Sequence, residues 1–145
     1  PLKRLTCVHG HACGSTDSAP ALDISGSWDD PAHDGEGFII QQFSGTEVIA
    51  FYFSYDSSGE QAWMFNTGTV SGNRLSFPEL LQPAGGHFGR SFDPDTISAQ
   101  PWGALEFELD CNNGKANYSS TLPGFSAGSQ NLVRLTFLQD SGCLF

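Results

Sequence analysis

Two segments of the sequence decide the fold, Gly37-Phe-Ile-Ile-Gln-Gln-Phe43 and Glu47-Val-Ile-Ala-Phe-Tyr-Phe-Ser-Tyr55. Both are rich in β-branched and aromatic residues, which are favoured in β-strands. The three residues between them, Ser44-Gly45-Thr46, are small and polar and suit a tight connection between antiparallel strands. The stretch therefore predicts a β-hairpin.

Strand-like segments continue towards the C-terminus. In residues 104–110 three apolar residues alternate with acidic ones, which is typical of a strand with one buried and one solvated face. The stretch from Pro83 to Pro101 contains a Gly-Gly pair and further prolines, so we expect a long loop there. Further strands are expected at residues 61–70, 74–77, 115–119 and 132–138, with turns at 56–59, 71–73 and 112–114.

These strands predict an all-β fold, an antiparallel meander of seven or eight strands. Such a chain forms an up-and-down barrel or a two-sheet sandwich, and we expect disulfides to staple it. Residues 1–23 are expected to form an N-terminal strand and cysteine loop, a candidate donor or exchanged segment, and residues 24–145 the barrel or sandwich. Six phenylalanines are expected in the core: Phe38, Phe43, Phe51, Phe53, Phe77 and Phe107.

The composition narrows the function classes. The chain has 145 residues, with 6 Lys and Arg against 16 Asp and Glu, so its formal net charge is −10. This charge argues against nucleic acid and anionic membrane surfaces as partners. No apolar run approaches the ~18 residues of a membrane span. Because the sequence begins at Pro1 rather than Met, we interpret it as a mature or trimmed fragment.

Four cysteines, an even number, favour a protein that is exported through an oxidising compartment. We therefore expect an extracellular or cell-surface location. The favoured disulfide joins Cys111, at a strand end, to Cys143, beyond the last strand. A second joins Cys7 to Cys13 in a small loop. The alternatives are other pairings, such as Cys13 with Cys111, or a metal site that uses the two histidines between Cys7 and Cys13.

The two ends of the chain share a Leu-x-Arg-Leu-Thr motif. Residues 2–6 match residues 132–136, and Cys13 matches Cys143 in the same register. The N-terminal copy either pairs within its own sheet, completes the sheet of a neighbouring chain, or ends a preceding unit of a tandem array. Its matched residues, which form the candidate assembly strand, are Leu2, Arg4, Leu5 and Thr6.

The segment from Trp28 to Glu36 gathers side-chain oxygens. One interpretation is a calcium site, although the spacing does not follow the EF-hand pattern. The favoured interpretation is an acidic turn whose aspartates accept backbone hydrogen bonds. We therefore expect no cofactor, with calcium or zinc as alternatives. The weak candidate metal ligands are Asp29, Asp30, Asp34 and Glu36.

Recognised catalytic patterns are missing from the sequence. The serines lack a Gly-x-Ser-x-Gly context, and the pair Glu106 and Glu108 lies on the solvated face of a predicted strand. We therefore expect that the chain is not an enzyme. Asn117-Tyr-Ser119 fits the N-glycosylation sequon. The tryptophans either plug the ends of a barrel or contact a ligand such as a sugar, and the candidates are Trp28, Trp63 and Trp102.

A set of motifs spread over residues 24–143 carries a family resemblance. The motifs are Gly26-Ser-Trp28, Asp30-Pro31, Gly35-Glu-Gly-Phe38, Trp102-Gly103, Cys111, Tyr118, Leu132 to Thr136 and Cys143. Together they resemble an uncharacterised secreted β-domain family of Gram-negative bacteria. The resemblance implies export and β architecture, and it implies no activity. The Gly-x-Trp opening is also similar to that of lipocalins and avidins, which implies room for a small-ligand cavity.

Two functions are expected from these observations. The leading one is a secreted structural subunit that associates with itself, into an extracellular filament formed by strand complementation through residues 1–6. The alternative is an extracellular binding module for carbohydrate or a small apolar ligand. The expected partners are therefore the chain itself and, in the alternative, carbohydrate.

Overall fold

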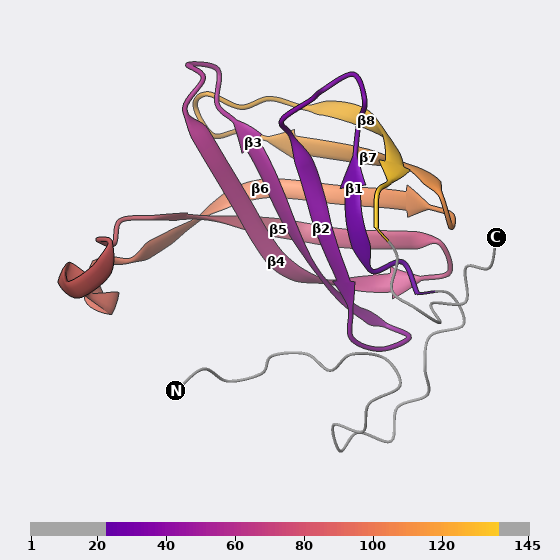
Figure 1. Cartoon of the computed structure of the whole chain (residues 1–145), viewed down its shortest axis with the longest axis horizontal. Coiled ribbons are helices and arrows are strands. Elements are labelled where there is room, and N and C mark those ends of the chain that lie inside the picture. Colours follow the sequence, from indigo (N-terminus) through magenta and orange to yellow (C-terminus); the bar gives the residue numbers. More distant parts are fainter. Residues whose placement is uncertain (1–22, 137–145) are drawn as a thin grey trace.

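Eight antiparallel strands form a closed β-barrel (Figure 1). The computed structural model describes residues 23–136. Each strand pairs with the next along the chain, and the last closes the barrel against the first, so the predicted all-β fold is confirmed as a barrel. The elements are β1 (Gly26–Asp29), β2 (Gly37–Gln42), β3 (Glu47–Tyr55), β4 (Gln61–Ser71), β5 (Arg74–Ala84), the 3-10 helices η1 (Gly89–Ser91) and η2 (Pro94–Thr96), β6 (Ser98–Leu109), β7 (Asn113–Ser120) and β8 (Gly128–Arg134).

The hairpin predicted at residues 37–55 is formed by β2 and β3. Ile40 lies opposite Ala50 in their register, and the backbone N–H of Phe43 donates to the carbonyl of Glu47 (2.9 Å) across the turn. Alternate side chains of β3 are buried inside the barrel, while those between them point outward. The local sequence therefore fixes both the turn and the register of the first strands.

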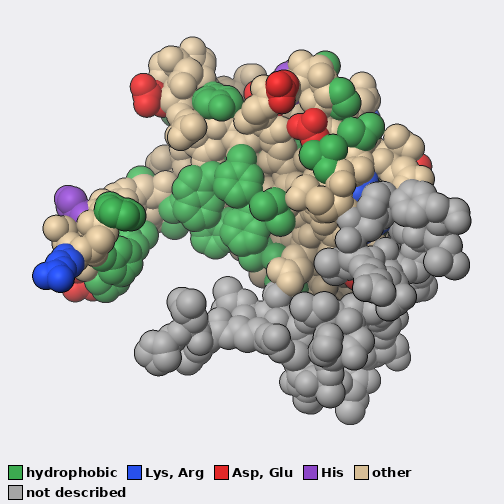
Figure 2. Space-filling view, viewed as in Figure 1, with side chains coloured by type: hydrophobic (Ala, Val, Ile, Leu, Met, Phe, Trp, Pro, Cys, Tyr) green, Lys and Arg blue, Asp and Glu red, His purple; other side chains and the backbone are tan. Residues whose placement is uncertain are grey.

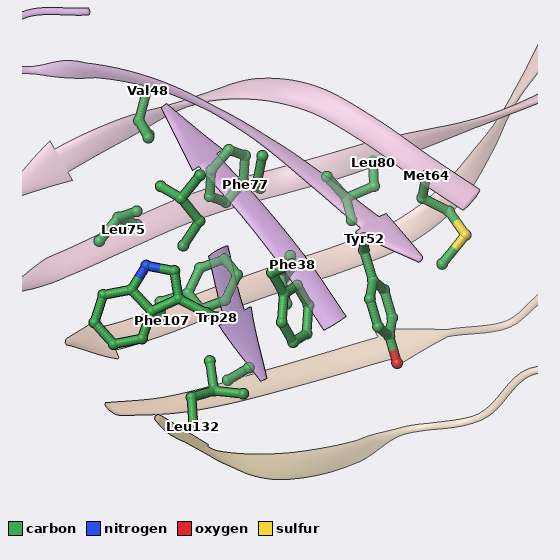
Figure 3. Close-up of a cluster of buried hydrophobic side chains, with 14 of the residues drawn as sticks. Trp28, Phe38, Val48, Tyr52, Met64, Leu75, Phe77, Leu80, Phe107 and Leu132 are labelled. Carbon is green, nitrogen blue, oxygen red and sulfur yellow. The ribbon is translucent and has the colours of Figure 1, made fainter. Parts of the chain in front are cut away.

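Aromatic side chains fill the interior of the barrel (Figure 3). Phe38 stacks on Tyr52 with ring centroids 4.4 Å apart, and Phe107 meets the Phe38 ring edge-on at 5.0 Å. Phe77 packs against Phe107 in the same way at 6.0 Å. Offset and edge-on contacts of this kind stabilise a core beyond the area that it buries.

Three of the six phenylalanines predicted in the core lie elsewhere. Phe51 and Phe53 lie on the outer face of β3, and Phe43 is exposed just beyond β2. The prediction was wrong because β3 carries apolar residues on both faces, so that its composition does not indicate which face is buried. The other three phenylalanines are buried as predicted.

Trp28 and Arg134 seal one end of the barrel, which we call the closed end. Trp28 is buried, and its indole Nε1 donates to the carbonyl of Ile24 at 3.0 Å. The Arg134 guanidinium lies 5.5 Å from the centre of the Trp28 ring and donates to the carbonyl oxygens of Asp23 and Ser25. β1 and β8 share only two register pairs, so few backbone hydrogen bonds join them. The side-chain contacts of Trp28 and Arg134 therefore help to close the barrel.

The long loop predicted between Pro83 and Pro101 is shorter than expected, because only residues 85–97, which include η1 and η2, lie outside the strands. β5 continues to Ala84 and β6 begins at Ser98, so the two strands run on past the barrel as a paired arm (Figure 1). Both prolines lie within this register and have no register partner on their other side. A proline that faces a free edge removes no ladder hydrogen bond, so the strands tolerate it.

The last strand also differs from the prediction. β8 spans Gly128–Arg134 rather than residues 132–138. Its first residue lies opposite Tyr118 of β7, and pairing continues through a polar stretch that includes Gln130. Cross-strand pairing with β7 therefore extends β8 into a segment whose hydrophobic pattern does not predict a strand.

Several predictions concern residues that lie outside the described range. These are the assembly strand at residues 1–6 and three cysteines, Cys7, Cys13 and Cys143. Strand complementation and the disulfide pairings therefore stay predictions. Cys111 lies between β6 and β7 and is not a free thiol. Within residues 23–136, none of the helices has the length and apolar character needed to cross a membrane.

Candidate functional site

Three loops border the end of the barrel opposite Trp28, which we call the mouth, because in an antiparallel meander alternate connections share one end. The fourth connection of that end lies at the tip of the arm formed by β5 and β6. Two of the three loops at the mouth touch. The backbone N–H of Ser57 in the β3–β4 turn donates to the carbonyl of Gly124 in the β7–β8 loop at 2.9 Å. Gly124 has a φ of +88°, and a Cβ there would lie 3.3 Å from the Cβ of Asp56. Glycine therefore allows this loop to reach across the mouth.

A pocket of about 240 Å³ lies at this contact. Tyr52 and Trp102 form part of its wall, and Tyr52 stacks in turn on Phe38 of the core. The pocket is therefore a cup above a filled interior. Its lining residues are Glu36, Tyr52, Ser54, Tyr55, Asp56, Ser57, Trp102, Tyr118, Gly124, Phe125 and Ser126.

The carboxylate of Glu36 is the charged centre of this pocket. Its Oε2 accepts hydrogen bonds from the Tyr52 hydroxyl (3.1 Å), the Ser54 hydroxyl (3.1 Å) and Gln130 Nε2 (3.0 Å). The three donors come from β3 and β8, and Glu36 itself directly precedes β2. No Lys, Arg or His among residues 23–136 forms an ion pair with Glu36. The pocket therefore holds a carboxylate that neutral donors orient and that no cation of the described residues neutralises.

Two of the three tyrosines that line the pocket, Tyr52 and Tyr118, are held in their neutral form. Burial raises the pKa of Tyr52 far above its usual value of 10.0, and the charge of Glu36 acts in the same direction. Burial also raises the pKa of Tyr118, again with a contribution from Glu36. At neutral pH both hydroxyl groups therefore keep their protons, and Tyr52 uses its own to bind Glu36.

Four aromatic rings surround this charge. Trp102 meets the Phe125 ring at 5.6 Å and 79°, and the Tyr52 ring at 5.9 Å and 78°. Tyr118 is tilted against both Tyr52 (5.9 Å) and Trp102 (6.4 Å). Since Trp102 stands nearly at right angles to two of its neighbours, the rings form a corner rather than one flat platform.

Two buried polar atoms at this end of the barrel lack a hydrogen-bonding partner within residues 23–136. They are the indole Nε1 of Trp102 and the amide Oε1 of Gln130. Both residues are 2 % exposed. An unmet buried hydrogen bond costs about 1–3 kcal/mol, so the two atoms mark a place where a ligand could supply what the fold does not.

The structure separates the three tryptophans named from the sequence. Trp102 lines the pocket at the mouth. Trp28 plugs the closed end, where it is 1 % exposed, and so it is not placed to contact a ligand at the mouth. Trp63 points outward from β4 and is 42 % exposed.

The four acidic residues named as weak metal ligands are not gathered around one point: Asp29 ends β1, and the other three lie between β1 and β2. Asp30 accepts the backbone N–H groups of Ala32 (2.9 Å) and Asn131 (3.2 Å), and it contacts His33 Nδ1 at 2.9 Å. These backbone hydrogen bonds, the one from Ala32 foremost, lower the pKa of Asp30. Glu36 instead joins the mouth pocket. Among residues 23–136 the side chains of His, Cys, Asp and Glu form no group of three or more that could hold a metal ion.

Sequence reasoning missed most of the pocket. Gln130 lies 94 residues from Glu36, so no local spacing connects them. One signal was present in β3, where the inward positions run from Val48 and Ala50 to Tyr52 and Ser54. A polar end to an otherwise apolar inward row indicates a site rather than core.

A second surface feature lies on the outside of β2, β3 and β4 (Figure 2). We call it the outer aromatic face. Phe51 lies opposite Phe65 with ring centroids 6.1 Å apart, and Trp63 stacks on Phe65 at 5.5 Å. The face consists of Ile39, Phe51, Phe53, Trp63 and Phe65.

Comparison with known proteins returns no family model, no curated protein and no solved structure that matches this chain. The chemistry of the pocket is therefore inferred from its own residues. A carboxylate, hydroxyl groups and aromatic rings around one small cavity are groups with which proteins orient a small polar ligand. The geometry supports binding at the mouth.

Proposed function

We propose that this chain is an extracellular binding module that holds a small polar ligand at the mouth of its barrel. The observation that carries the proposal is the Glu36 carboxylate, which lies among aromatic rings and has no ion-pair partner within residues 23–136. A charge in such surroundings is costly unless something compensates it. The extracellular setting rests on the cysteine content of the sequence.

A polar ligand suits this pocket better than the small apolar ligand that the sequence also suggested. An apolar ligand would remove water from Glu36 without replacing its hydrogen bonds. The core rings beneath the pocket occupy the space that a long apolar ligand would need. A cavity of about 240 Å³ corresponds to about eight water volumes at ~30 Å³ each, which limits the ligand to a small molecule.

Isothermal titration calorimetry with monosaccharides, amino sugars and small amines tests this proposal. We expect saturable binding by at least one class, weakened about tenfold by Glu36→Gln, which removes one charge-assisted interaction. The matched control is Glu47→Gln, which makes the same change at an exposed residue near the closed end. Absence of binding across the panel, or equal weakening by the control, would overturn the proposal.

A second candidate function is self-association, and the outer aromatic face supports it. A soluble barrel usually turns polar residues outward, whereas this face carries no charged side chain. Three of its five large side chains are 42–45 % exposed and two are partly buried, so the face presents about 400 Å² of apolar surface, within the range of the largest patch on a monomer. Neighbouring rings on this face stack on one another, and their edges form ridges. The same face of a second copy could pack against these ridges.

Sedimentation velocity over a range of protein and salt concentrations tests this second function. We expect a dimer that strengthens with salt, because salt screens the repulsion between two copies of charge −10. The double variant Phe53→Ser with Trp63→Ser should be monomeric. Leu135→Ser, which removes an exposed apolar side chain at the closed end, should leave the dimer unchanged. A wild-type monomer throughout, or a dimer that survives the double variant, contradicts this function of the face.

A further inference from the structure

We infer that the ligand of the mouth pocket is a small organic ammonium ion. This inference deepens the proposed function and rests on it. It draws on three features of the site: the charges that line the pocket, the orientation of its rings, and the balance of its hydrogen-bond donors and acceptors.

The charged residues that line the pocket are all acidic. Glu36 and Asp56 line the pocket, and no Lys, Arg or His is among its lining residues. Asp56 accepts the Ser58 hydroxyl (2.6 Å) and the backbone N–H of Glu60 (3.0 Å), and these hydrogen bonds lower the pKa of its carboxyl. The chain as a whole adds a net charge of −10, which draws cations and repels anions.

The rings are arranged to surround a compact cation. The negative face of an aromatic ring attracts a cation that lies within ~6 Å of its centre. Trp102 stands nearly perpendicular to both Tyr52 and Phe125, and the partly exposed rings of Tyr118 and Phe125 supply the surface that a ligand can reach. A flat sugar ring needs one open platform for stacking, whereas a small ammonium group fits into a corner.

Around Glu36, two acceptor atoms are without a hydrogen bond from residues 23–136. The hydroxyls of Tyr52 and Ser54 and the amide N–H of Gln130 are already donated to Glu36 Oε2. Glu36 Oε1 accepts no hydrogen bond from residues 23–136, and the buried Oε1 of Gln130 is also unpartnered there. An ammonium N–H, or the polarised C–H of a methylated ammonium, supplies a positive donor. An anionic ligand would meet the carboxylates of Glu36 and Asp56, with only neutral donors, such as the indole N–H of Trp102, to offset their repulsion.

Titration calorimetry with choline and with 3,3-dimethyl-1-butanol, its neutral carbon analogue, tests the inference. The two molecules have nearly the same shape and differ in charge, so unmodified protein suffices. We expect choline or ethanolamine to bind and the neutral analogue to bind at least about tenfold more weakly, as expected when a desolvated cation–π contact is lost. Choline binding should weaken with rising salt and in Glu36→Gln, and it should be unchanged in Glu47→Gln.

The outcomes separate the inference from the function on which it rests. Equal binding of choline and its neutral analogue overturns the inference that the ligand is a cation. Binding of a neutral sugar, with no binding of choline, ethanolamine or 2-phenylethylamine, overturns the cation and leaves a binding module. No binding by any of these compounds overturns both.

Discussion

At the scale of single residues, the barrel depends on glycines at positions where the packing leaves no room for a side chain. Gly68 lies in β4, where the register with β5 shifts between Phe65 and Thr69. A Cβ at Gly68 would lie 2.6 Å from Cδ1 of the Phe77 ring and would also clash with the carbonyl oxygen of Ser76. At this shift the backbone of β4 therefore packs directly against a core ring, with no room for a side chain between them.

Gly68→Ala should lower the free energy of unfolding by about 2 kcal/mol, because Phe77 would have to leave its place in the core. Urea denaturation should show an earlier midpoint with an unchanged slope. Gly45→Ala is the control, since a Cβ at Gly45 meets nothing within 4 Å. Equal stability of the two variants would contradict the close packing described for β4 and β5.

Tyr52 predicts a loss of stability in alkali. Its pKa is raised in the folded chain, so above pH 10 the unfolded chain releases this proton while the folded chain keeps it. Stability should therefore fall as pH rises beyond 10, and Tyr52→Phe should flatten that part of the profile. Thermal melts from pH 8 to pH 11 measure the effect, and an identical slope in the variant would refute it.

At the scale of elements, the seam between β1 and β8 is the place where the barrel closes. Arg134 donates from its guanidinium to the carbonyls of Asp23, Ser25, Cys111 and Thr136. A planar group with five donors can reach several carbonyls at once. The arginine of the Leu-x-Arg-Leu-Thr motif at residues 132–136 thus has a structural role.

Arg134→Ala should destabilise the barrel by about 3 kcal/mol, because it leaves buried carbonyls without donors. Arg134→Lys should recover little of this loss, since an ammonium cannot reproduce the planar contacts. Arg74→Ala is the comparison: Arg74 forms an exposed ion pair with Glu108 (3.1 Å), and removing it should cost less than about 1 kcal/mol. Similar losses in Arg134→Ala and Arg74→Ala, measured by urea denaturation, would argue against the role of Arg134.

The elements also indicate how far sequence reasoning reaches. The hairpin of β2 and β3 was predictable because composition, turn residues and spacing agree locally. The arm of β5 and β6 was not predictable, because Pro83 and Pro101 indicate a loop. A strand tolerates such prolines at a free edge, but the sequence does not show which edges are free. The mouth pocket was not predictable either, because Glu36 and Gln130 meet only once the barrel closes.

At the scale of the whole molecule, three turns share one kind of support. Asp30, Asp56 and Asp110 each accept backbone N–H groups of their own turn. Hydrogen bonds lower the pKa of each: from the backbone of Ala32 for Asp30, from the Ser58 hydroxyl for Asp56 and from the backbone of Asn113 for Asp110. The turns at both ends of the barrel thus depend on ionised aspartates.

These aspartates predict how the fold responds to acid. A pKa lowered on folding contributes stability that is present above the unfolded value of 3.8 and is lost as pH falls through the folded value. The melting temperature should therefore be nearly constant from pH 7 to pH 5 and should fall below about pH 4. Asp110→Asn should reduce this drop. A melting temperature that rises on acidification would contradict the assignment.

The position of the closed end has a practical consequence for attaching the protein to a surface. The described chain enters at Asp23 and leaves at Thr136, and both residues lie beside Arg134 at that end. Whatever is linked before the first strand or after the last one therefore leaves from the end away from the pocket. A tether attached next to Asp23 or Thr136 should therefore hold the barrel with its mouth facing the solution.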